Sequence, residues 1–324
     1  MKAIVNTAPG CVDWKDVPTP EPAPGQVRIR TAACGICATD LEMIAGWQRT
    51  SFPAIPGHEW SGIVDAFGPG VDPKWLGKSC VADNVLGDGG EVGFEHSGGY
   101  GQYLLTEARN LYLLPPDFPL STAALIEPLA VCVRALNRLR PQNLESALVL
   151  GDGVIGLLML LLLKAHGIRH IAVVGGRPGR LAMARQLGAS DILNYHDAGT
   201  DLPTAVRRLP SAPFPNIAEA SGSSAAMHAS LEVASKGGRI VVIGDYGPGR
   251  ADFPWNRILH NELEIIGSNA SAGAWPEAVR LATTHALPLD LLVSQCLPAA
   301  SYAQALDLAR RSRDIVKIVL TWKD

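Results

Sequence analysis

The chain has no concentration of positive charge and no long apolar segment. Its 28 Lys and Arg residues and 31 Asp and Glu residues give a net charge of −3. Because no stretch gathers the basic residues, the sequence excludes a typical nucleic-acid-binding protein. The longest apolar run lies within 154–163 and is about half as long as a bilayer span requires, so we expect no membrane partner.

Cysteine is also scarce, with six residues scattered over 324 positions. The first residues, MKAIVNTAPG, do not combine a charged segment with an apolar one, as a secretory leader does. We therefore expect reduced thiols in a cytoplasmic protein, and not a disulfide framework. The length and the 47% apolar content predict about two globular domains.

The sequence has two parts that differ in their expected secondary structure. The first 110 residues read as short strands separated by turns, and the segment Gln26–Ala33 alternates polar and apolar residues as a half-buried strand does. Beyond residue 121, strands alternate with helices, which predicts a parallel, doubly wound sheet. The expected elements are strands at Lys2–Val5, Gly62–Phe67, Tyr100–Leu105, Ala147–Leu150, Ile171–Val174, Ile217–Ala220, Arg239–Ile243, Glu264–Ile266 and Ile315–Thr321, and helices at Ser121–Leu139 and Arg180–Leu187.

A glycine motif is the sharpest local signal. Gly151, Gly153 and Gly156 follow an apolar strand and open a helix, as in a dinucleotide-binding turn. They allow a tight turn, close approach of the backbone to a pyrophosphate, and close packing of helix on strand. The first helical residues, Val154 and Ile155, would offer free N–H groups to the phosphates. The alternative interpretation is a glycine turn that binds no ligand.

The end of the next strand favours NADP(H) over NAD(H). Enzymes that use NAD normally carry an acid there, which bonds the ribose 2′-hydroxyl. Here the strand runs into Gly175, with Arg177 and Arg180 shortly after it, and no acid follows. Glycine leaves room for a 2′-phosphate, and arginine can pair with it bidentately. The alternative is that both arginines are solvated residues at a helix start.

Candidate metal ligands occur in three separate places. Cys37 lies in the segment CGICATD, His58 and Glu59 in the segment PGHE, and Glu127 in the segment IEPLA. Thiolate, imidazole and carboxylate are the ligands that zinc takes in catalytic sites. Sequence spacing alone does not show that they converge, and a lone His-Glu pair is more often a surface or core feature.

Taken together, these motifs resemble the zinc-containing medium-chain dehydrogenase/reductase superfamily, especially its polyol and threonine dehydrogenase branches. The resemblance rests on GICATD at 35–40, PGHEWSG at 56–62, GGYGQYLL at 98–105, EPLAV at 127–131, GDGVIG at 151–156 and EASG at 219–222. It implies a GroES-like β-barrel catalytic domain, residues 1–127 and 270–324, and an α/β Rossmann domain, residues 128–269, with the active site in the cleft between them.

The resemblance also implies roles for single residues. Cys37 and His58 match two zinc ligands, and Glu59 matches either a third ligand or a group close behind the ligands. Glu127 matches a glutamate that ligates zinc directly or through water. Thr39 matches the residue that hydrogen-bonds the substrate oxygen and passes on its proton.

The sequence departs from its relatives in two places. No cysteine lies between Cys80 and Cys132, where many relatives carry four that bind a structural zinc, so we expect one catalytic zinc and no second site. Glu42 stands where relatives often carry a histidine that relays the proton to solvent, so the relay could use the Glu42 carboxylate, the cofactor ribose or water.

Asp40, in contrast, matches the relatives, which carry there a carboxylate suited to orienting an imidazole ligand.

The resemblance thus predicts a zinc-dependent oxidoreductase that transfers hydride between NADP, or NAD, and a secondary alcohol or ketone, namely a polyol, sugar or cyclitol. Trp47 could pack over such a substrate or be an ordinary hydrophobic anchor. His96 could line the substrate site or be a solvated loop residue, and Ser268 and Asn269 could bond the nicotinamide carboxamide. We expect a homodimer or homotetramer. The competing interpretations are a zinc-free NADPH-dependent reductase and a non-catalytic NADP(H)-binding sensor or structural protein.

Overall fold

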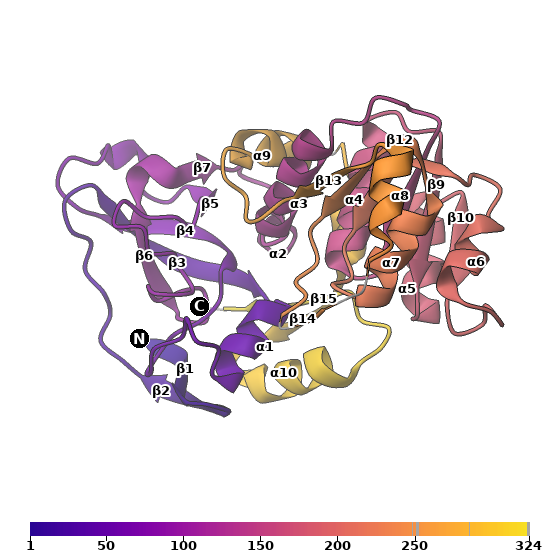
Figure 1. Cartoon of the computed structure of the whole chain (residues 1–324). Coiled ribbons are helices and arrows are strands. Elements are labelled where there is room, and N and C mark those ends of the chain that lie inside the picture. The colour runs from indigo at the N-terminus through magenta and orange to yellow at the C-terminus, as the bar shows by residue number, and fades with distance from the viewer. Residues whose placement is uncertain (248, 251–252, 285, 323–324) are drawn as a thin grey trace. The chain divides into compact units, whose positions relative to one another are not determined.

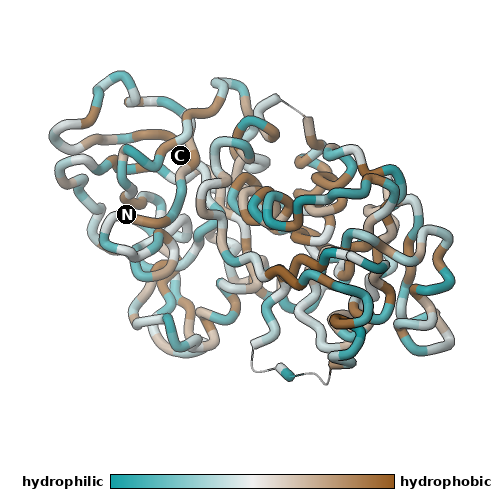
Figure 2. Tube along the Cα trace, turned by 45° about the horizontal axis from the view of Figure 1, so that its top comes forward, coloured by the Kyte–Doolittle hydropathy of each residue, from teal (hydrophilic) through white to brown (hydrophobic). Residues whose placement is uncertain are grey.

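Two compact units make up the chain in the computed structural model, which describes residues 1–247, 249–250, 253–284 and 286–322. The first unit combines Met1–Glu127 with Trp275–Asp324, and the second comprises Pro128–Ala274 (Figure 1). Apolar and hydrophilic stretches both occur along the coloured trace of each unit (Figure 2). Each unit also contains a cluster of buried apolar side chains.

The first unit is built on a seven-stranded sheet with the order β14-β15-β3-β4-β5-β7, and β6 also pairs with β3. The alternation of Gln26–Gly35 produces a strand whose side chains are buried and half-buried in turn, as the sequence predicts. A separate hairpin joins β1 (Lys2–Ala8) and β2 (Cys11–Asp16). The sheet strands are β3 (Gln26–Gly35), β4 (Glu59–Phe67), β5 (Ser79–Ala82), β6 (Tyr103–Glu107), β7 (Leu111–Leu113), β14 (Val293–Pro298) and β15 (Lys317–Thr321).

Short helices complete this unit. Helix α1 (Ala38–Ala45) starts directly after β3, with Cys37 as its N-cap residue. It ends at Gly46, whose φ of 103° lies in the left-handed region that glycine adopts without strain. The others are α2 (Leu120–Ala123), α9 (Trp275–Thr283) and α10 (Tyr302–Arg311), while α3 (Ile126–Leu139) begins in the first unit and continues in the second.

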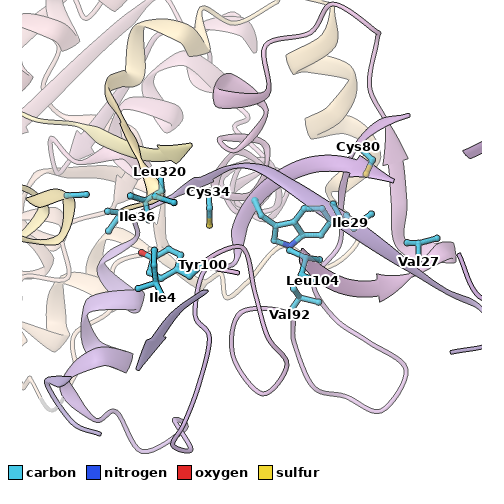
Figure 3. Close-up of a cluster of buried hydrophobic side chains, with 14 of the residues drawn as sticks. Ile4, Val27, Ile29, Cys34, Ile36, Cys80, Val92, Tyr100, Leu104 and Leu320 are labelled. Carbon is cyan, nitrogen blue, oxygen red and sulfur yellow. The ribbon is translucent and has the colours of Figure 1, made fainter. Parts of the chain in front are cut away.

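An apolar cluster fills the interior of the first unit (Figure 3). Ile4, Ile29 and Leu104 are fully buried there, each removing apolar surface from water at about 25 cal/mol per Å². Cys34 belongs to the same cluster, and burial raises the pKa of its thiol well above the usual range. The side chain of Cys34 therefore lies in the core as an uncharged thiol.

The strand predicted at Tyr100–Leu105 starts later, at Tyr103. The glycine-rich segment before it bonds instead to the loop that precedes His58: Gly98 N–H donates to Ile55 O at 2.8 Å and Tyr100 N–H to Pro56 O at 3.0 Å. Because these backbone groups are already satisfied, the segment packs as a loop beside His58 and joins the sheet only at Tyr103.

The second unit contains a six-stranded sheet with the order β10-β9-β8-β11-β12-β13. All its strand pairs are parallel. This is the strand order of a dinucleotide-binding Rossmann fold, so the predicted α/β class with a doubly wound sheet is confirmed. Its strands are β8 (Ser146–Leu150), β9 (His170–Gly175), β10 (Asp191–Asn194), β11 (Phe214–Glu219), β12 (Ala234–Val242) and β13 (Glu264–Gly267).

Helices connect these strands. Helix α4 (Val154–Ala165) is buried from Gly156 to Leu163, as expected of a helix that is apolar on every face. Helix α5 begins at Pro178, a residue suited to a first helical turn, and ends at the left-handed Gly188. The helices of this unit besides α3 and α4 are α5 (Pro178–Leu187), α6 (Leu202–Arg207), α7 (Ser224–Val233) and α8 (Trp255–Asn261).

Among the described residues, one helical stretch, Leu120–Leu139, is long and apolar enough to cross a bilayer. Over half of its most apolar window, 56%, is buried within the protein. Such burial is typical of a core helix in a globular protein, and a membrane span is weakly supported.

Candidate metal centre and nucleotide site

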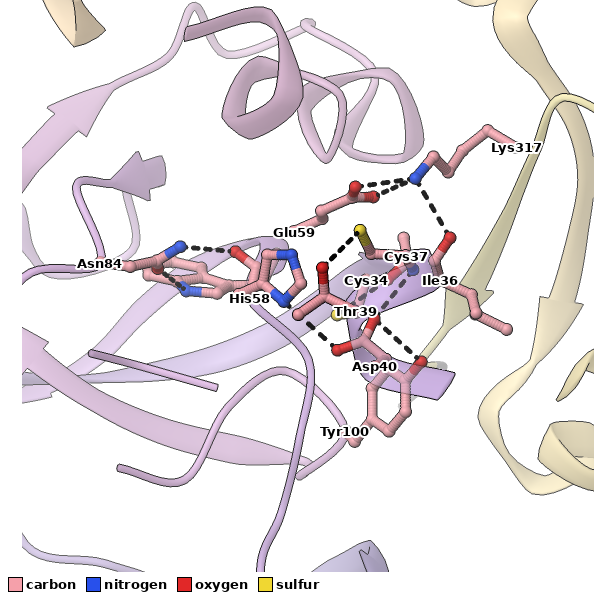
Figure 4. Close-up of polar contacts among 12 residues, drawn as sticks. Cys34, Ile36, Cys37, Thr39, Asp40, His58, Glu59, Asn84, Tyr100 and Lys317 are labelled. Carbon is pink, nitrogen blue, oxygen red and sulfur yellow. Dashed lines mark hydrogen bonds and ion pairs between the residues drawn. The ribbon is translucent and has the colours of Figure 1, made fainter. Parts of the chain in front are cut away.

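Three candidate metal ligands converge where β3 and β4 lie side by side. In the antiparallel register, Gly35 faces Glu59, so Cys37, just after β3, lies opposite His58 and Glu59. Figure 4 shows the sulfur of Cys37 and the imidazole of His58 near the carboxylate of Glu59, whose two oxygens are bonded to Lys317. One ligand atom from each of these side chains lies within 4.8 Å of the other two. This donor set and spacing suit a single zinc ion.

Asp40 supports the imidazole of His58 from behind. Its Oδ1 lies 3.3 Å from Nδ1 of the nearly buried His58, and its Oδ2 accepts a bond from Cys37 N–H at 2.8 Å. Burial opposes the charged imidazole, but the Asp40 carboxylate and Cys37 outweigh it and raise the pKa of His58 well above its ordinary value. The negative surroundings that hold this proton would also favour a cation.

Lys317 on β15 holds Glu59. Its Nζ lies 2.7 and 2.6 Å from the two carboxylate oxygens and donates to Ile36 O at 3.1 Å. Burial opposes the ammonium charge, but Glu59 offsets it and raises the pKa of Lys317. Gly35 is required beside this pair because a Cβ there would collide with the Glu59 carboxylate. Lys317 was missed in the sequence analysis.

Glu127, in the first turn of α3, is not a member of the three-ligand group. Burial raises the pKa of its carboxyl to about 7, the charge of His58 lowers it, and that of Glu59 raises it further. Glu127 is therefore close enough to sense the ligands electrostatically. A carboxyl titrating near neutrality is typical of functional sites.

The remaining residues predicted in the first unit separate into two groups. Thr39 Oγ1 lies 3.7 Å from Cys37 Sγ, next to the ligand group. His96, in contrast, is 39% exposed in its side chain, and its Nε2 lies 2.9 Å from Asp88. Thr39 therefore lies beside the three candidate ligands, whereas His96 contacts Asp88 at the surface.

Phe94 contacts both Trp47 and His58, which is one of the candidate metal ligands. Its ring lies 4.8 Å from the imidazole of His58 and 6.4 Å from the indole of Trp47, centroid to centroid. The guanidinium carbon of Arg49 lies 4.6 Å from the centroid of the Phe94 ring, and Arg49 Nη2 donates to Glu95 Oε2 at 2.8 Å. The glycine-rich segment 84–99 thus supplies an aromatic side chain beside a ligand. No motif in the sequence identified Phe94.

The glycine motif of the second unit forms an open cradle. Gly151 has a φ of 126°, and a Cβ on Gly156 would collide with Gly151 O, so both positions require glycine. A Cβ on Gly153 would meet no atom within 4 Å, which leaves space in front of the first turn of α4. These features fit a dinucleotide pyrophosphate.

Ser268 and Asn269 follow the end of β13 and line a pocket of about 610 Å³. The hydroxyl of Ser268 is buried and has no hydrogen-bond partner among the described residues. A buried hydroxyl that lacks a partner is consistent with a site that binds a polar ligand.

The two arginines predicted to bind a 2′-phosphate lie at the start of α5, with Arg177 at its N-cap and Arg180 in its first turn.

Comparison with known proteins agrees with this geometry. The model of the alcohol dehydrogenase GroES-like domain matches residues 23–116, and that of the zinc-binding dehydrogenases matches residues 154–284, together more than half of the chain. The chain belongs to the zinc-type medium-chain dehydrogenase/reductase superfamily, in its polyol-dehydrogenase-like branch. It is an oxidoreductase of the alcohol dehydrogenase class.

Two relatives extend over nearly the whole chain. D-arabitol-phosphate dehydrogenase of Enterococcus avium is 27% identical and aligns with 97% of this chain and 96% of its own. Galactitol 1-phosphate 5-dehydrogenase of Escherichia coli K12 is also 27% identical, over 96% of this chain and 97% of its own. The crystal structure of the E. coli galactitol-1-phosphate dehydrogenase, 26% identical, superposes with a TM-score of 0.88 over 99% of this chain and 100% of the other.

Proposed function

We propose that the protein is a zinc-dependent, NADP(H)-linked dehydrogenase of secondary alcohols. The observation that carries this proposal is the meeting of Cys37, His58 and Glu59, with ligand atoms within 4.8 Å of one another. These residues come from the ends of two paired strands, and they offer soft, borderline and hard donors to one ion.

Cys37 and His58 would hold the zinc, together with a carboxylate. Glu59 binds directly only if it leaves Lys317, so Glu127, directly or through water, is the other candidate for the third ligand. When bound, zinc acts as a Lewis acid that brings the pKa of an alcohol oxygen toward neutrality. Asp40 would hold the imidazole of His58 in its ligating orientation.

Thr39 would accept the proton of the substrate hydroxyl and pass it toward solvent, since its hydroxyl lies beside Cys37. Phe94 and Trp47 would form an apolar wall that excludes water next to His58. The nicotinamide cofactor supplies the chemistry of hydride exchange. A hydroxyl-bearing carbon skeleton with hydrophobic faces, such as a polyol, sugar or cyclitol, suits an aromatic wall of this kind.

The second unit would bind the cofactor. Gly151, Gly153 and Gly156 would cradle the pyrophosphate, with the N–H groups of Val154 and Ile155 directed at it. In addition, Ser268 and Asn269 would bond the carboxamide, and Gly175, Arg177 and Arg180 would receive a 2′-phosphate. NADP(H) is therefore the preferred cofactor, and NAD(H) the alternative.

The test combines metal analysis with a substrate panel. We expect the purified protein to contain about one zinc per chain and to oxidise at least one polyol, sugar or cyclitol, with or without a phosphate group. The substitutions Cys37→Ala and His58→Ala remove both zinc and turnover. Cys296→Ala and His96→Ala are the matched controls, because both residues are exposed and lie outside the ligand group.

The outcomes separate the competing functions. Full turnover after zinc removal would identify a zinc-free reductase, and NADP(H) binding without turnover of any panel member would identify a binding protein. We also expect a homodimer or homotetramer, which light scattering coupled to gel filtration would measure.

A further inference from the structure

Asp152, the second residue of the glycine motif, extends to the end of the neighbouring strand. Parallel pairing of Leu150 with Val174 brings the turn after β8 beside the turn after β9. Oδ2 of Asp152 accepts bonds from Gly176 N–H at 3.0 Å and Arg177 N–H at 2.8 Å. Its other oxygen, Oδ1, accepts a hydrogen bond from Nη1 of the Arg177 guanidinium at 2.9 Å.

No side chain fits on the last strand residue itself. A Cβ on Gly175 would collide with the carboxylate of Asp152, and a Cβ on Gly176 would collide with the ring of Tyr195. Gly175 therefore leaves no room, at its own position, for the acid that dinucleotide folds usually carry at this strand end. A carboxylate from the glycine motif, that of Asp152, reaches this place instead.

The charge of that carboxylate is already satisfied. Asp152 is only 3% exposed in its side chain and is surrounded by two N–H donors and one guanidinium. The side chain of Arg177 remains 45% exposed, and Asp152 engages its guanidinium through Nη1. Because a guanidinium is a planar fork, fixing one nitrogen fixes the direction of the others.

We propose that Asp152 is a positioning residue for cofactor selection, which aims the free nitrogens of Arg177 at the 2′-phosphate of an NADP-type dinucleotide. The inference rests on the proposed function. Asp152 acts by holding the Gly176–Arg177 backbone and the guanidinium in one geometry, so the entropy of ordering Arg177 is lost during folding and not during binding. The two backbone bonds and the ion pair together also reduce repulsion between Asp152 and a phosphate.

The opposite role is chemically possible for the same carboxylate. If a bound ribose displaced Arg177, the oxygens of Asp152 would accept hydrogen bonds from the ribose hydroxyls, and the site would select NAD(H). The two roles differ in the sign of the effect of removing Asp152. Removal lowers selectivity for the 2′-phosphate in the first case and raises it in the second.

The experiment is a calorimetric titration with 2′,5′-ADP and 5′-AMP, which differ only in the 2′-phosphate and need neither zinc nor substrate. The variants are D152N, D152A, R177A and D152A/R177A, with R185A as the control on the exposed side of the same helix. We expect the wild type to bind 2′,5′-ADP tighter than 5′-AMP by roughly tenfold or more. Each single substitution removes most of that ratio, and R185A leaves it unchanged.

The double variant tests whether Asp152 acts through Arg177. Adding D152A to R177A is expected to lower the ratio no further, because residues that act as one unit are not additive. An unchanged or increased ratio in a folded D152N protein overturns the inference, and D152N keeps the side-chain size in case D152A fails to fold. If the wild type binds neither nucleotide, the proposed function fails instead.

Discussion

Lys317 donates to both carboxylate oxygens of Glu59, and the two side chains are 2% and 1% exposed. A buried ion pair of this kind stabilises weakly in itself, because both charges lose their hydration. Removing one of the two charged groups lowers the stability of the fold strongly, because the other charge is then buried without a partner.

We therefore expect Lys317→Met to lower the free energy of unfolding by about 3–5 kcal/mol. Urea denaturation followed by circular dichroism measures the change. The double variant Glu59→Gln/Lys317→Met is the control, because it removes both charges and should recover part of the loss. A Lys317→Met protein as stable as the wild type would show that Glu59 does not depend on Lys317.

Asp40→Asn should weaken zinc binding by about 10–100-fold, which is typical when the partner of a metal-bound imidazole is lost. The physical reason is the 3.3 Å approach of Asp40 Oδ1 to His58 Nδ1. Competition with a chromophoric chelator measures the affinity. Asp88→Asn, next to His96 on the surface, is the matched control and should bind zinc normally.

The metal-free protein should lose stability as the pH rises toward neutrality. Burial raises the pKa of Glu127 to about 7 from an ordinary value of 4.5, so the native state binds more protons than the unfolded state in this window. The contribution is fully present below pH 4.5 and is lost as the pH passes 7. Glu127→Gln removes the carboxyl, so the difference in unfolding free energy between the two proteins should change across this window. A constant difference would contradict the burial of Glu127.

Two glycines of the cradle should behave differently. Gly156→Ala should cost about 1–3 kcal/mol of unfolding free energy, because its Cβ would overlap Gly151 O. Gly153→Ala should fold with near-normal stability, since its Cβ would meet open space, but it should bind 5′-AMP more weakly by filling the cradle. Thermal melts and the same titrations compare the variants. Equal melting temperatures for both would mean that Gly156 is not packed against Gly151.

Local patterns predicted much of this protein. The glycine motif after an apolar strand predicted the α/β class, and the Cys37 and His58-Glu59 segments pointed to the superfamily to which the chain belongs. The absence of an acid at the end of the strand Ile171–Val174 could also be seen in the sequence, because Gly175 and Gly176 follow that strand directly.

Contacts between distant segments could not be predicted in this way. Lys317 reaches Glu59 only because β15 pairs with β3, and Asp152 reaches Arg177 only because β8 and β9 align in parallel. Phe94 reaches His58 through a loop with no regular pattern. Residue spacing carries no information about such distances, which depend on strand register and on how loops fold back.

The place of β15 in the sheet has a consequence for biosynthesis. The candidate ligands Cys37, His58 and Glu59 leave the ribosome early, but the counter-charge for Glu59 lies 258 residues later. Until Lys317 has been synthesised, the carboxylate of Glu59 lacks this counter-charge, and the end of β3 that pairs with β15 is an open sheet edge. Formation of the Glu59–Lys317 ion pair therefore has to wait for the synthesis of β15.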